Sequence, residues 1–308
     1  MKTLVTGGAG FIGSNIIKQL ILDGHDVTAY DNLSSGYRSN LDPYPDARFI
    51  EGDIRDDGKL NDAIKGAEVV FHLAASVGNK RSINHPVEDA EINMLGTVKV
   101  LTAAVREGVR KIVFSSSAGI FGELKTLPIR EDHPCEPDSP YGSSKLGAEK
   151  ECLSFAKLFD IEAVCLRYFN VYGPNQRYDA YGNVIPIFVF KMLNGEPITI
   201  FGNGEQTRDF INVRDVVQAN LLAGNSSGVS GAFNLGSGSQ ITINNLVKIL
   251  ASASGLDPAI EYGPPRPGDV LHSKADLTAI QEALGFMPAV DFHEGLSEYI
   301  EWAIGETK

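Results

Sequence analysis

The chain has 308 residues, 43% of them hydrophobic and 21% charged, and its formal net charge of −12 corresponds to a pI of about 5.0. This composition is that of an ordinary globular protein, long enough for one large or two modest domains. The excess of acidic residues argues against nucleic acid or an anionic membrane as the main partner.

The three cysteines are too few and too scattered to form a disulfide framework or a Cys-x-x-Cys metal site. We therefore expect no metal and a reducing compartment. The N-terminal residues read as a structural strand and not as a secretory leader, and the densest apolar stretch, 184–193, contains Pro186 and Lys191. These features predict a cytoplasmic protein without a membrane partner.

A strand expected at 2–6 leads into a glycine-rich turn, Thr6-Gly-Gly-Ala-Gly-Phe-Ile-Gly13, and then into a helical pattern. Gly7 permits the tight turn, Gly10 has no side chain to keep a diphosphate off the backbone, and Gly13 lets helix and strand pack closely. The helix N-terminus offers free N–H groups to the pyrophosphate. The residues assigned to this contact are Gly7, Gly10, Phe11 and Ile12. The alternative is an ordinary strand-to-helix connection.

The next apolar strand, 27–30, is followed by Asp31, eighteen residues after Gly13. A carboxylate at this spacing binds the hydroxyls of the adenosine ribose and would repel a 2′-phosphate, so we predict NAD and not NADP. Asn32 follows as a second candidate contact to the cofactor. The alternative is a turn aspartate ahead of Asn32 and Ser34.

Downstream, apolar strands alternate with helical patterns. Strands are expected at 48–51, 69–73, 111–115 and 163–167, and helices near 59–65, 87–107 and 141–159. This alternation predicts an α/β fold with a doubly wound parallel (Rossmann) sheet, whose ligands gather beyond the carboxyl ends of the strands.

From Tyr168 onward proline and glycine become frequent and the strict alternation is lost. We expect an NAD-binding domain over 1–170 with a return segment at about 209–236. The rest of 171–308 is expected to form a smaller α/β substrate domain. An amphipathic stripe within 209–223 supports the return segment.

Two further strand ends carry candidate cofactor residues. Asp53 and Ile54 follow the third strand and could flank an adenine, with helix capping by Asp53 as the alternative. His72 begins the run His72-Leu73-Ala74-Ala75, whose small residues let a dinucleotide approach the backbone. His72 itself is expected to be a hydrogen-bonded core histidine.

Tyr141 and Lys145 are spaced i and i+4 on an expected helix that begins near Pro140, so their side chains share one face. A phenol with a pKa near 10 is a poor base at neutral pH, and a nearby ammonium favours the phenolate. A tyrosine poised in this way can take or return a hydroxyl proton. The alternative is an unrelated pair of surface residues.

Ser115-Ser116-Ser117 ends the fifth strand at the same sheet edge. The Ser117 hydroxyl could bind the same substrate oxygen as Tyr141 and relay its proton. The alternative is a serine that only caps a helix or a turn.

The chain resembles the extended short-chain dehydrogenase/reductase family, in its branch of nucleotide-sugar epimerases and dehydratases, over nearly its whole length. The segments that carry the resemblance are the glycine-rich turn, Asp31-Asn32-Leu33, Gly52-Asp53, His72-Leu-Ala-Ala75, Asn93, Ser115-Ser-Ser117, Ser139-Pro-Tyr-Gly-Ser-Ser-Lys145, Leu166-Arg-Tyr-Phe-Asn170, Val171-Tyr-Gly-Pro174 and Arg208-Asp209. The resemblance implies bound NAD, a catalytic triad and a nucleoside-diphosphate sugar as substrate.

The resemblance also assigns residues by position. The implied triad is Ser117, Tyr141 and Lys145. Further implied NAD contacts are Asn93, Ser115 and Tyr168. Implied substrate contacts are Asn170, Asn183, Val184, Arg208, Arg266 and Asp269. A homodimer through the long helices after Val87 and Tyr141 is expected on the same ground.

The branch of the family follows from the residues after Ser117. Dehydratases and decarboxylases of this kind carry acidic residues there, whereas this chain has Ala118 and Gly119. The resemblance therefore implies a UDP-hexose 4-epimerase that passes through a 4-keto sugar. Alternatives are a UDP-glucuronate 4-epimerase, a dehydratase, a reductase or a non-catalytic dinucleotide sensor.

Ser273 resembles the gate of the epimerase hexose pocket, where a bulky aromatic residue excludes an N-acetyl group. Because serine is small, UDP-N-acetylglucosamine and UDP-N-acetylgalactosamine are expected as substrates besides UDP-glucose and UDP-galactose. The alternative is a residue that is small by chance.

Overall fold

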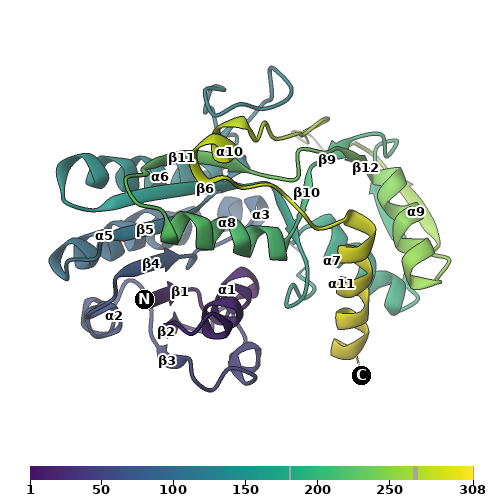
Figure 1. Cartoon of the computed structure of the whole chain (residues 1–308). Coiled ribbons are helices and arrows are strands. Elements are labelled where there is room, and N and C mark those ends of the chain that lie inside the picture. The colour runs from purple at the N-terminus through teal and green to yellow at the C-terminus, as the bar shows by residue number, and fades with distance from the viewer. Residues whose placement is uncertain (180–181, 266–269, 308) are drawn as a thin grey trace.

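The computed structural model describes residues 1–179, 182–265 and 270–307, and a parallel sheet lies at its centre (Figure 1). Within these residues the sheet has seven strands in the order β11-β6-β5-β4-β1-β2-β3. The strands are β1 (Lys2–Thr6), β2 (Asp26–Asp31), β3 (Arg48–Glu51), β4 (Val69–His72), β5 (Lys111–Ser117), β6 (Glu162–Tyr168) and β11 (Gly231–Leu235). All neighbours are parallel, so the expected doubly wound α/β fold is confirmed.

Helices cover both faces of the sheet, and the alternation of side chains along each strand decides which face they meet. In β4, Val69 and Phe71 pack against one set of helices, while Val70 packs against the other. The first set is α1 (Phe11–Leu22), α8 (Val213–Asn225) and α10 (Thr278–Leu284). The second set is α2 (Asp57–Ile64), α5 (Gly96–Arg106) and α6 (Pro140–Leu158).

The helix expected at 87–107 is interrupted. The structure has α4 (Pro86–Ala90), a π-helical turn η2 (Glu91–Leu95) and then α5. A π turn holds one more residue than an α turn, which shifts the following side chains around the axis. Asn93, in the middle of η2, is buried as a result. A short helix that the sequence analysis did not predict, α3 (Asn79–Asn84), precedes α4.

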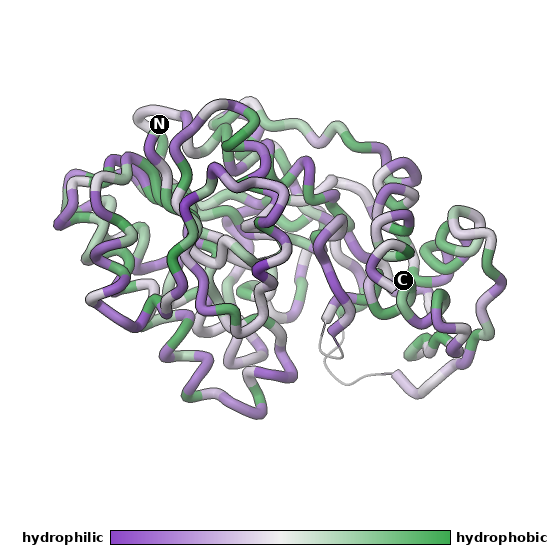
Figure 2. The backbone as a smooth tube through the Cα atoms, turned by 90° about the horizontal axis from the view of Figure 1, so that it is seen from below, coloured by the Kyte–Doolittle hydropathy of each residue, from purple (hydrophilic) through white to green (hydrophobic). Residues whose placement is uncertain are grey.

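A second group of elements, here called the C-terminal lobe, lies beside the sheet (Figures 1 and 2). Its helices are α7 (Val184–Leu193), α9 (Ile243–Ser254) and α11 (Phe292–Glu306). Its strands pair as β8 (Ile198–Phe201) with β13 (Ile260–Gly263) and β9 (Thr207–Arg208) with β12 (Ile241–Thr242). The lobe has its own apolar core, to which α7, α9 and α11 all contribute.

Two short strands connect the lobe to the sheet. β7 (Asn170–Tyr172) continues from β6, and it pairs in parallel with β10 (Phe210–Asn212), which leads into α8. Helix α8 and strand β11 thereby return the chain to the large sheet after the first elements of the lobe. The remaining short helices are η1 (Arg38–Leu41) and η3 (Ala118–Ile120).

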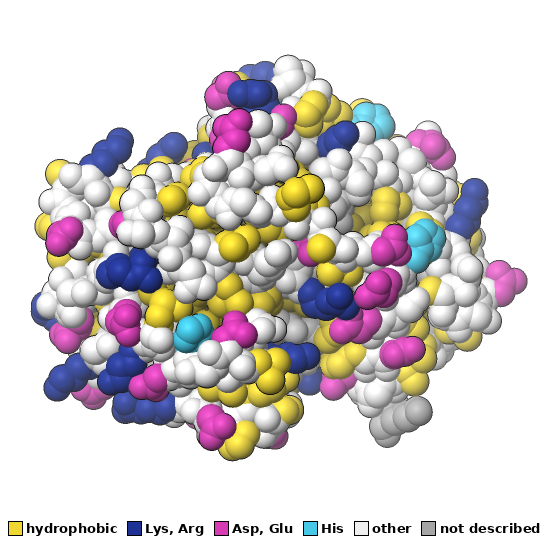
Figure 3. All heavy atoms as spheres, viewed as in Figure 1, with side chains coloured by type: hydrophobic (Ala, Val, Ile, Leu, Met, Phe, Trp, Pro, Cys, Tyr) yellow, Lys and Arg dark blue, Asp and Glu magenta, His cyan; other side chains and the backbone are white. Residues whose placement is uncertain are grey.

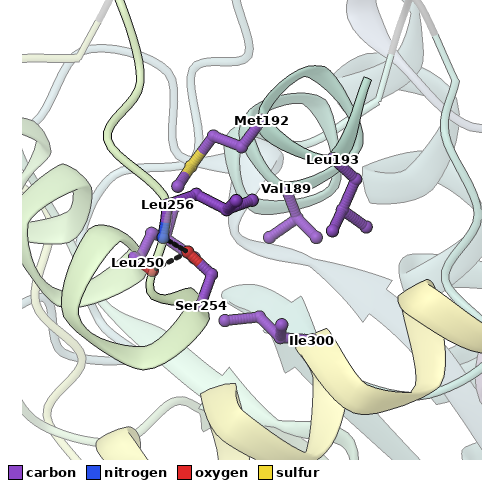
Figure 4. A pocket seen from close by; sticks show the side chains of 7 residues that line it. All are labelled: Val189, Met192, Leu193, Leu250, Ser254, Leu256 and Ile300. Atoms are coloured by element: carbon purple, nitrogen blue, oxygen red, sulfur yellow. Dashed lines mark hydrogen bonds between the residues drawn. The ribbon is translucent and has the colours of Figure 1, made fainter. Parts of the chain in front are cut away.

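Helices α7, α9 and α11 leave a small apolar gap between them, of about 160 Å³ including space open to solvent (Figure 4). Leu250 and Ile300 form its buried wall, and Leu256 lies at its more exposed rim. Within the part of the chain that the structure describes, no helix is long and apolar enough to cross a membrane. Acidic and basic side chains are interspersed over the face shown in Figure 3.

Candidate active site

The glycine-rich turn has the shape that a diphosphate requires. Gly7 has a φ of 68°, and a Cβ there would lie 2.7 Å from the backbone nitrogen of Ala74, while a Cβ on Gly13 would overlap the carbonyl oxygen of Gly7. Gly10 is the N-cap of α1 and makes no side-chain capping bond, and the first turn contains no acidic residue. The amides at Phe11 and Ile12 thus begin a helix whose positive end accepts an anion.

Asp31 ends β2 directly beside this turn. Its carboxylate accepts hydrogen bonds from the backbone nitrogens of Ala9, at 3.0 Å, and Leu33, at 2.8 Å. Burial raises the pKa of the Asp31 carboxyl, and these two bonds oppose the rise. A Cβ on Gly36 would lie 3.0 Å from both oxygens of the Asp31 carboxylate, so glycine at this position lets the backbone approach that carboxylate closely. The turn and this acid together fit the pyrophosphate and ribose of a dinucleotide.

Asn32 and Asp53 come together at the ends of β2 and β3, with the Asn32 amide donating to Asp53 at 2.9 Å. Arg55 binds the same carboxylate through both side chain and backbone and lowers the pKa of Asp53 to about 2. Asp56, and not Asp53, caps α2, so the capping alternative for Asp53 is wrong. The side chain of Ile54 is buried against Gly96 in the core, and its predicted contact with the adenine stays a prediction.

The end of β4 approaches the glycine-rich turn. The backbone nitrogens of Leu73 and Ala74 donate to the backbone oxygen and the hydroxyl of Thr6, at 3.0 and 3.3 Å, and Leu73, Ala74 and Ala75 are half-buried. His72 binds Thr6 and Thr97 with its two ring nitrogens, and burial lowers its pKa to about 3. His72 is therefore a neutral, hydrogen-bonded core histidine.

Asn93 is held by the loop that follows. Its side-chain oxygen accepts from the Ser76 nitrogen at 2.8 Å, and its amide donates to the Ser76 carbonyl oxygen at 2.9 Å. The buried amide is thus committed to fixing the 73–76 loop. Its predicted contact with the cofactor stays a prediction.

The helix that carries Tyr141 and Lys145 starts as the sequence indicates. Ser139 caps α6 by accepting from the Gly142 nitrogen at 3.1 Å, and Pro140 occupies the first turn. Tyr141 is half-buried, whereas Lys145 is 2% exposed, with its Nζ 4.4 Å from the centre of the Phe114 ring. Both side chains belong to one face of α6, against the end of β5.

Ser117, the last residue of β5, faces Tyr141. A Cβ on Gly119 would lie 3.3 Å from the Ser117 hydroxyl oxygen and 3.7 Å from the Tyr141 ring, so the two groups flank the same small space. A hydrogen bond joins Ser117 and the Tyr141 phenol and lowers the pKa of that phenol. The Gly119 nitrogen also donates to the Ser117 hydroxyl, at 3.1 Å.

The pKa values of the pair differ from the expectation. Burial outweighs the hydrogen bond, so the pKa of the Tyr141 phenol is raised and not lowered. Burial also lowers the pKa of the Lys145 ammonium to about 8, against the nearby negative charges of Asp89 and Glu149. The predicted spacing is therefore present, but in the protein alone desolvation dominates the acidity of the phenol.

The other two serines of β5 face the interior. Ser115 donates to the His72 carbonyl oxygen at 3.1 Å, and Ser116 donates to the buried carboxylate of Glu149 at 2.7 Å. The ring of Tyr168 packs in the core and its hydroxyl pairs with Asn220 of α8, and its predicted place beside the nicotinamide stays a prediction. Strand alternation explains this orientation, since Tyr168 points to the same face as Leu166.

On the side of the C-terminal lobe, three predicted substrate residues gather around Asp209. The Asn170 side chain donates to the Asp209 carbonyl oxygen at 3.1 Å. Arg208 directly precedes Asp209, and its guanidinium donates to the Val270 carbonyl oxygen at 2.6 Å. Ser273 is buried two residues before Ala275. The backbone nitrogen of Ala275 donates to the Asp209 carboxylate.

The sequence predicts four other substrate residues. Asn183 is exposed at the N-terminus of α7, and Val184 is half-buried beside it. Arg266 and Asp269 lie outside the described residues.

Three buried charged residues near these groups have no role in the sequence-based site. Asp209 accepts four hydrogen bonds, Glu149 pairs with Arg167 at 2.8 Å, and Asp89 binds Ser144 between Tyr141 and Lys145. The i, i+4 spacing of Lys145 and Glu149 and of Asp89 and Asn93 on helical segments could have indicated two of them. No such spacing involves Asp209, which lies between β9 and β10.

A dinucleotide-binding turn, an acid at the end of the second strand and a Tyr-x-x-x-Lys helix against a serine define a Rossmann-type enzyme of the short-chain dehydrogenase/reductase class. The chain also matches the model of the NAD-dependent epimerase/dehydratase family over residues 3–236. It belongs to that family, and its cofactor is NAD.

The similarity to known proteins covers nearly the whole chain. It is 40% identical to the UDP-glucose 4-epimerase of Mycolicibacterium smegmatis, with 98% of each chain covered. Its structure resembles that of UDP-glucose 4-epimerase from Thermotoga maritima with UDP-glucose, with a TM-score of 0.95, 40% identity and full coverage of both chains. UDP-N-acetylglucosamine 4-epimerase from Methanobrevibacter ruminantium, in complex with UDP-N-acetylmuramic acid, has a TM-score of 0.94 and 38% identity, covering 99% of this chain and 98% of its own.

Proposed function

We propose that this chain is a UDP-hexose 4-epimerase, which interconverts gluco and galacto configurations through a transient 4-keto sugar. The observation that carries the proposal is the arrangement of Ser117, Tyr141 and Lys145 at the carboxyl edge of the sheet, next to a turn that fits NAD. The similarity to 4-epimerases of both UDP-glucose and UDP-N-acetylglucosamine supports it.

The proposed roles follow from the positions of the three residues. When bound, oxidised NAD supplies a positively charged ring that accepts the C4 hydride and later returns it. The Tyr141 phenolate takes the proton of the C4 hydroxyl, and the Ser117 hydroxyl holds that oxygen in place. Lys145 supplies a positive charge on the same helix face that favours the phenolate. After the sugar turns about its diphosphate link, Tyr141 gives the proton back.

The residues after Ser117 favour epimerisation over dehydration. Loss of water from the sugar needs an additional acid or base near C5 and C6. The corresponding positions here are Ala118 and Gly119, which form the start of η3 and bring no ionisable side chain to the space beside Tyr141. The proposed reaction therefore uses only proton and hydride transfer at C4.

The proposed sugar includes the N-acetylated hexoses. Ser273 is small and buried, on a segment held between Asp209 and the Ile129 backbone. Serine at this gate leaves room for an N-acetyl group. We expect Ser273→Tyr to abolish turnover of UDP-N-acetylglucosamine while UDP-glucose is still converted, and Ser273→Ala to keep both; unchanged N-acetyl turnover in Ser273→Tyr would contradict this assignment.

The first experiment is to incubate the purified protein with UDP-glucose or UDP-N-acetylglucosamine and follow the anomeric proton signals by NMR. The galacto isomer should accumulate to an equilibrium mixture without net formation of NADH. A keto or dehydrated product would instead support a dehydratase, a reduced product a reductase, and conversion of UDP-glucuronate alone the glucuronate epimerase. Retention of NAD without turnover of any of these sugars would support a dinucleotide sensor.

We also propose the domain division and a homodimer. Residues 1–170 with 209–236 form the NAD-binding domain, and the rest of 171–308 mainly binds the UDP-sugar. Exposed apolar side chains on the helical face of η2, α4 and α6 support a twofold contact there; they are Val87, Met94, Leu95 and Leu158. Light scattering should give twice the chain mass, and Leu95→Glu should give a monomer. A wild-type monomer would contradict the assignment.

A further inference from the structure

Asp89 is a buried acid that the proposed mechanism does not use. It lies on α4 and is 1% exposed. Its carboxylate accepts a hydrogen bond from the Ser144 hydroxyl at 2.5 Å, and the Asn93 amide lies 3.1 Å from its other oxygen. A buried carboxylate is costly unless hydrogen bonds or a charge compensate it, so this position calls for an explanation.

The partner of Asp89 lies between the two proposed catalytic side chains. Ser144 directly precedes Lys145 and follows Tyr141 by three residues, so it belongs to the same turns of α6. The Asn93 amide also lies 3.1 Å from the Ser144 hydroxyl oxygen. Asp89, Asn93 and Ser144 therefore form a closed triangle that ties α4 and η2 to the first turns of α6.

The charge of Asp89 acts on both of these side chains. It raises the pKa of the Tyr141 phenol, in the same direction as the larger effect of burial. It also raises the pKa of the Lys145 ammonium, which burial lowers by more. Burial raises the pKa of Asp89 itself, while Ser144, Asn93 and Lys145 lower it. The carboxylate of Asp89 is thus a negative charge that acts on both members of the Tyr141–Lys145 pair.

The other charged groups around α4 are turned elsewhere. Glu91 of η2 is exposed and pairs with Arg55, and Arg81 of α3 pairs with Asp179. Lys80 of α3 is exposed. Within α6, Glu149 acts on Lys145 from the following turn and is itself paired with Arg167.

We propose that Asp89 is a positioning residue for this site: its carboxylate clamps the first turns of α6 through Ser144 and sets the charge balance around Tyr141 and Lys145. The inference rests on the proposed function in so far as Tyr141 exchanges protons with the sugar. Its consequence is that the pH range of activity depends on a residue that touches neither sugar nor cofactor.

Two variants separate the clamp from the charge. Asp89→Asn keeps the size and an oxygen acceptor for Ser144 but removes the charge, so both Tyr141 and Lys145 should lose their protons at lower pH. The whole bell-shaped profile of kcat then moves to lower pH, and the ratio of variant to wild-type kcat falls severalfold between about pH 6 and about pH 9. Ser144→Ala keeps the charge and removes the clamp, so kcat should fall about tenfold with the profile in place and NAD retained.

The matched control is Glu88→Gln, which removes the same charge from the neighbouring exposed residue of α4. It should leave the profile and kcat unchanged. The inference is overturned if the acidic and basic limbs of the kcat profile lie at the same pH in Asp89→Asn as in Glu88→Gln. If Asp89→Asn does not fold, an unchanged kcat in Ser144→Ala overturns the clamp.

A second measurement does not depend on turnover. The phenol of Tyr141 is titrated by the ultraviolet absorbance of tyrosinate, as the difference between each protein and the same protein carrying Tyr141→Phe. Asp89→Asn should lower the pH at which this phenol ionises. If the wild type converts no sugar nucleotide, the proposed function fails while this titration still decides the role of Asp89.

Discussion

Two buried carboxylates, Asp89 and Asp209, organise opposite sides of the candidate site in different ways. Asp89 is bound by side chains, next to a lysine, on helices that pack against one sheet edge. Asp209 is bound by the backbone nitrogens of Ser237, Gly238 and Ala275 and by one hydroxyl. Burial raises the pKa of both acids.

The difference separates two tasks. The side with Asp89 is made of one strand end and the helical segments α4, η2 and α6, which fix the reacting groups by regular structure. The side with Asp209 joins three segments that are 28 to 66 residues apart in the sequence, and no regular element alone could bring them together. We infer that the first side serves the chemistry and the second serves recognition of the sugar nucleotide, so changes to each should alter different kinetic constants.

The largest effect is expected from Tyr141→Phe, which removes only the phenol oxygen. The value of kcat should fall about 10²- to 10⁴-fold, because the proton of the C4 hydroxyl loses its acceptor. Bound NAD and the melting temperature should stay as in the wild type. Tyr262→Phe, on the exposed strand β13, is the control, and comparable loss in both variants would remove Tyr141 from the chemistry.

The next effect tests whether the C-terminal lobe can be weakened without changing the chemistry. Leu250→Ala deletes a fully buried side chain beside the gap in Figure 4 and should lower the free energy of unfolding by about 2–5 kcal/mol. Leu256→Ala, at the 38% exposed rim, should cost less. Below the unfolding transition kcat should be unchanged, and a loss of kcat in folded Leu250→Ala would show that the two sides are not separable.

Asp209→Asn should act on substrate affinity. An amide has one oxygen to accept from the donors that the carboxylate now satisfies, so the segments around Arg208 and Ser273 should shift. We expect KM for the UDP-sugar to rise about tenfold with kcat nearly unchanged. Asp257→Asn, exposed on the same lobe, is the control. A fall in kcat at constant KM would place Asp209 on the side of the chemistry.

The smallest effect concerns pH. Burial lowers the pKa of Lys145 to about 8, so the ammonium is present below that pH and is lost as the pH rises through it. The contribution of the Lys145 ammonium to kcat should fall about twofold between pH 7 and pH 8, while KM for the UDP-sugar should stay flat. The measurement is kcat and KM at each pH. A rise in KM with constant kcat would show instead that the titrating group contributes to substrate binding.

The parts of the site that could be predicted from sequence are those with local requirements. Gly7 and Gly13 are needed by the backbone of a single turn, and Tyr141 and Lys145 share a face through helix spacing alone. The doubly wound sheet follows in the same way, because alternating strand and helix patterns leave few other arrangements.

The rest depends on which side chains the packed fold buries. Ile54 and Tyr168 occupy positions next to family motifs, but core packing directs their side chains into the interior. Strand parity with Leu166 could have shown this for Tyr168. The donors to Asp209 come from distant segments, and nothing in the residues around Asp209 indicates them.

The π turn at η2 has a consequence for the evolution of this region. Each residue of an α-helix advances the chain by about 100° around the axis. Deleting one residue within 91–95 would restore a regular helix and rotate α4, with Asp89, by that angle relative to α5. A substitution along this helix changes one side chain and leaves the orientation of α4 relative to α5 in place, whereas a deletion rotates all of α4 at once. The number of residues here, and not only their identity, is therefore part of the site.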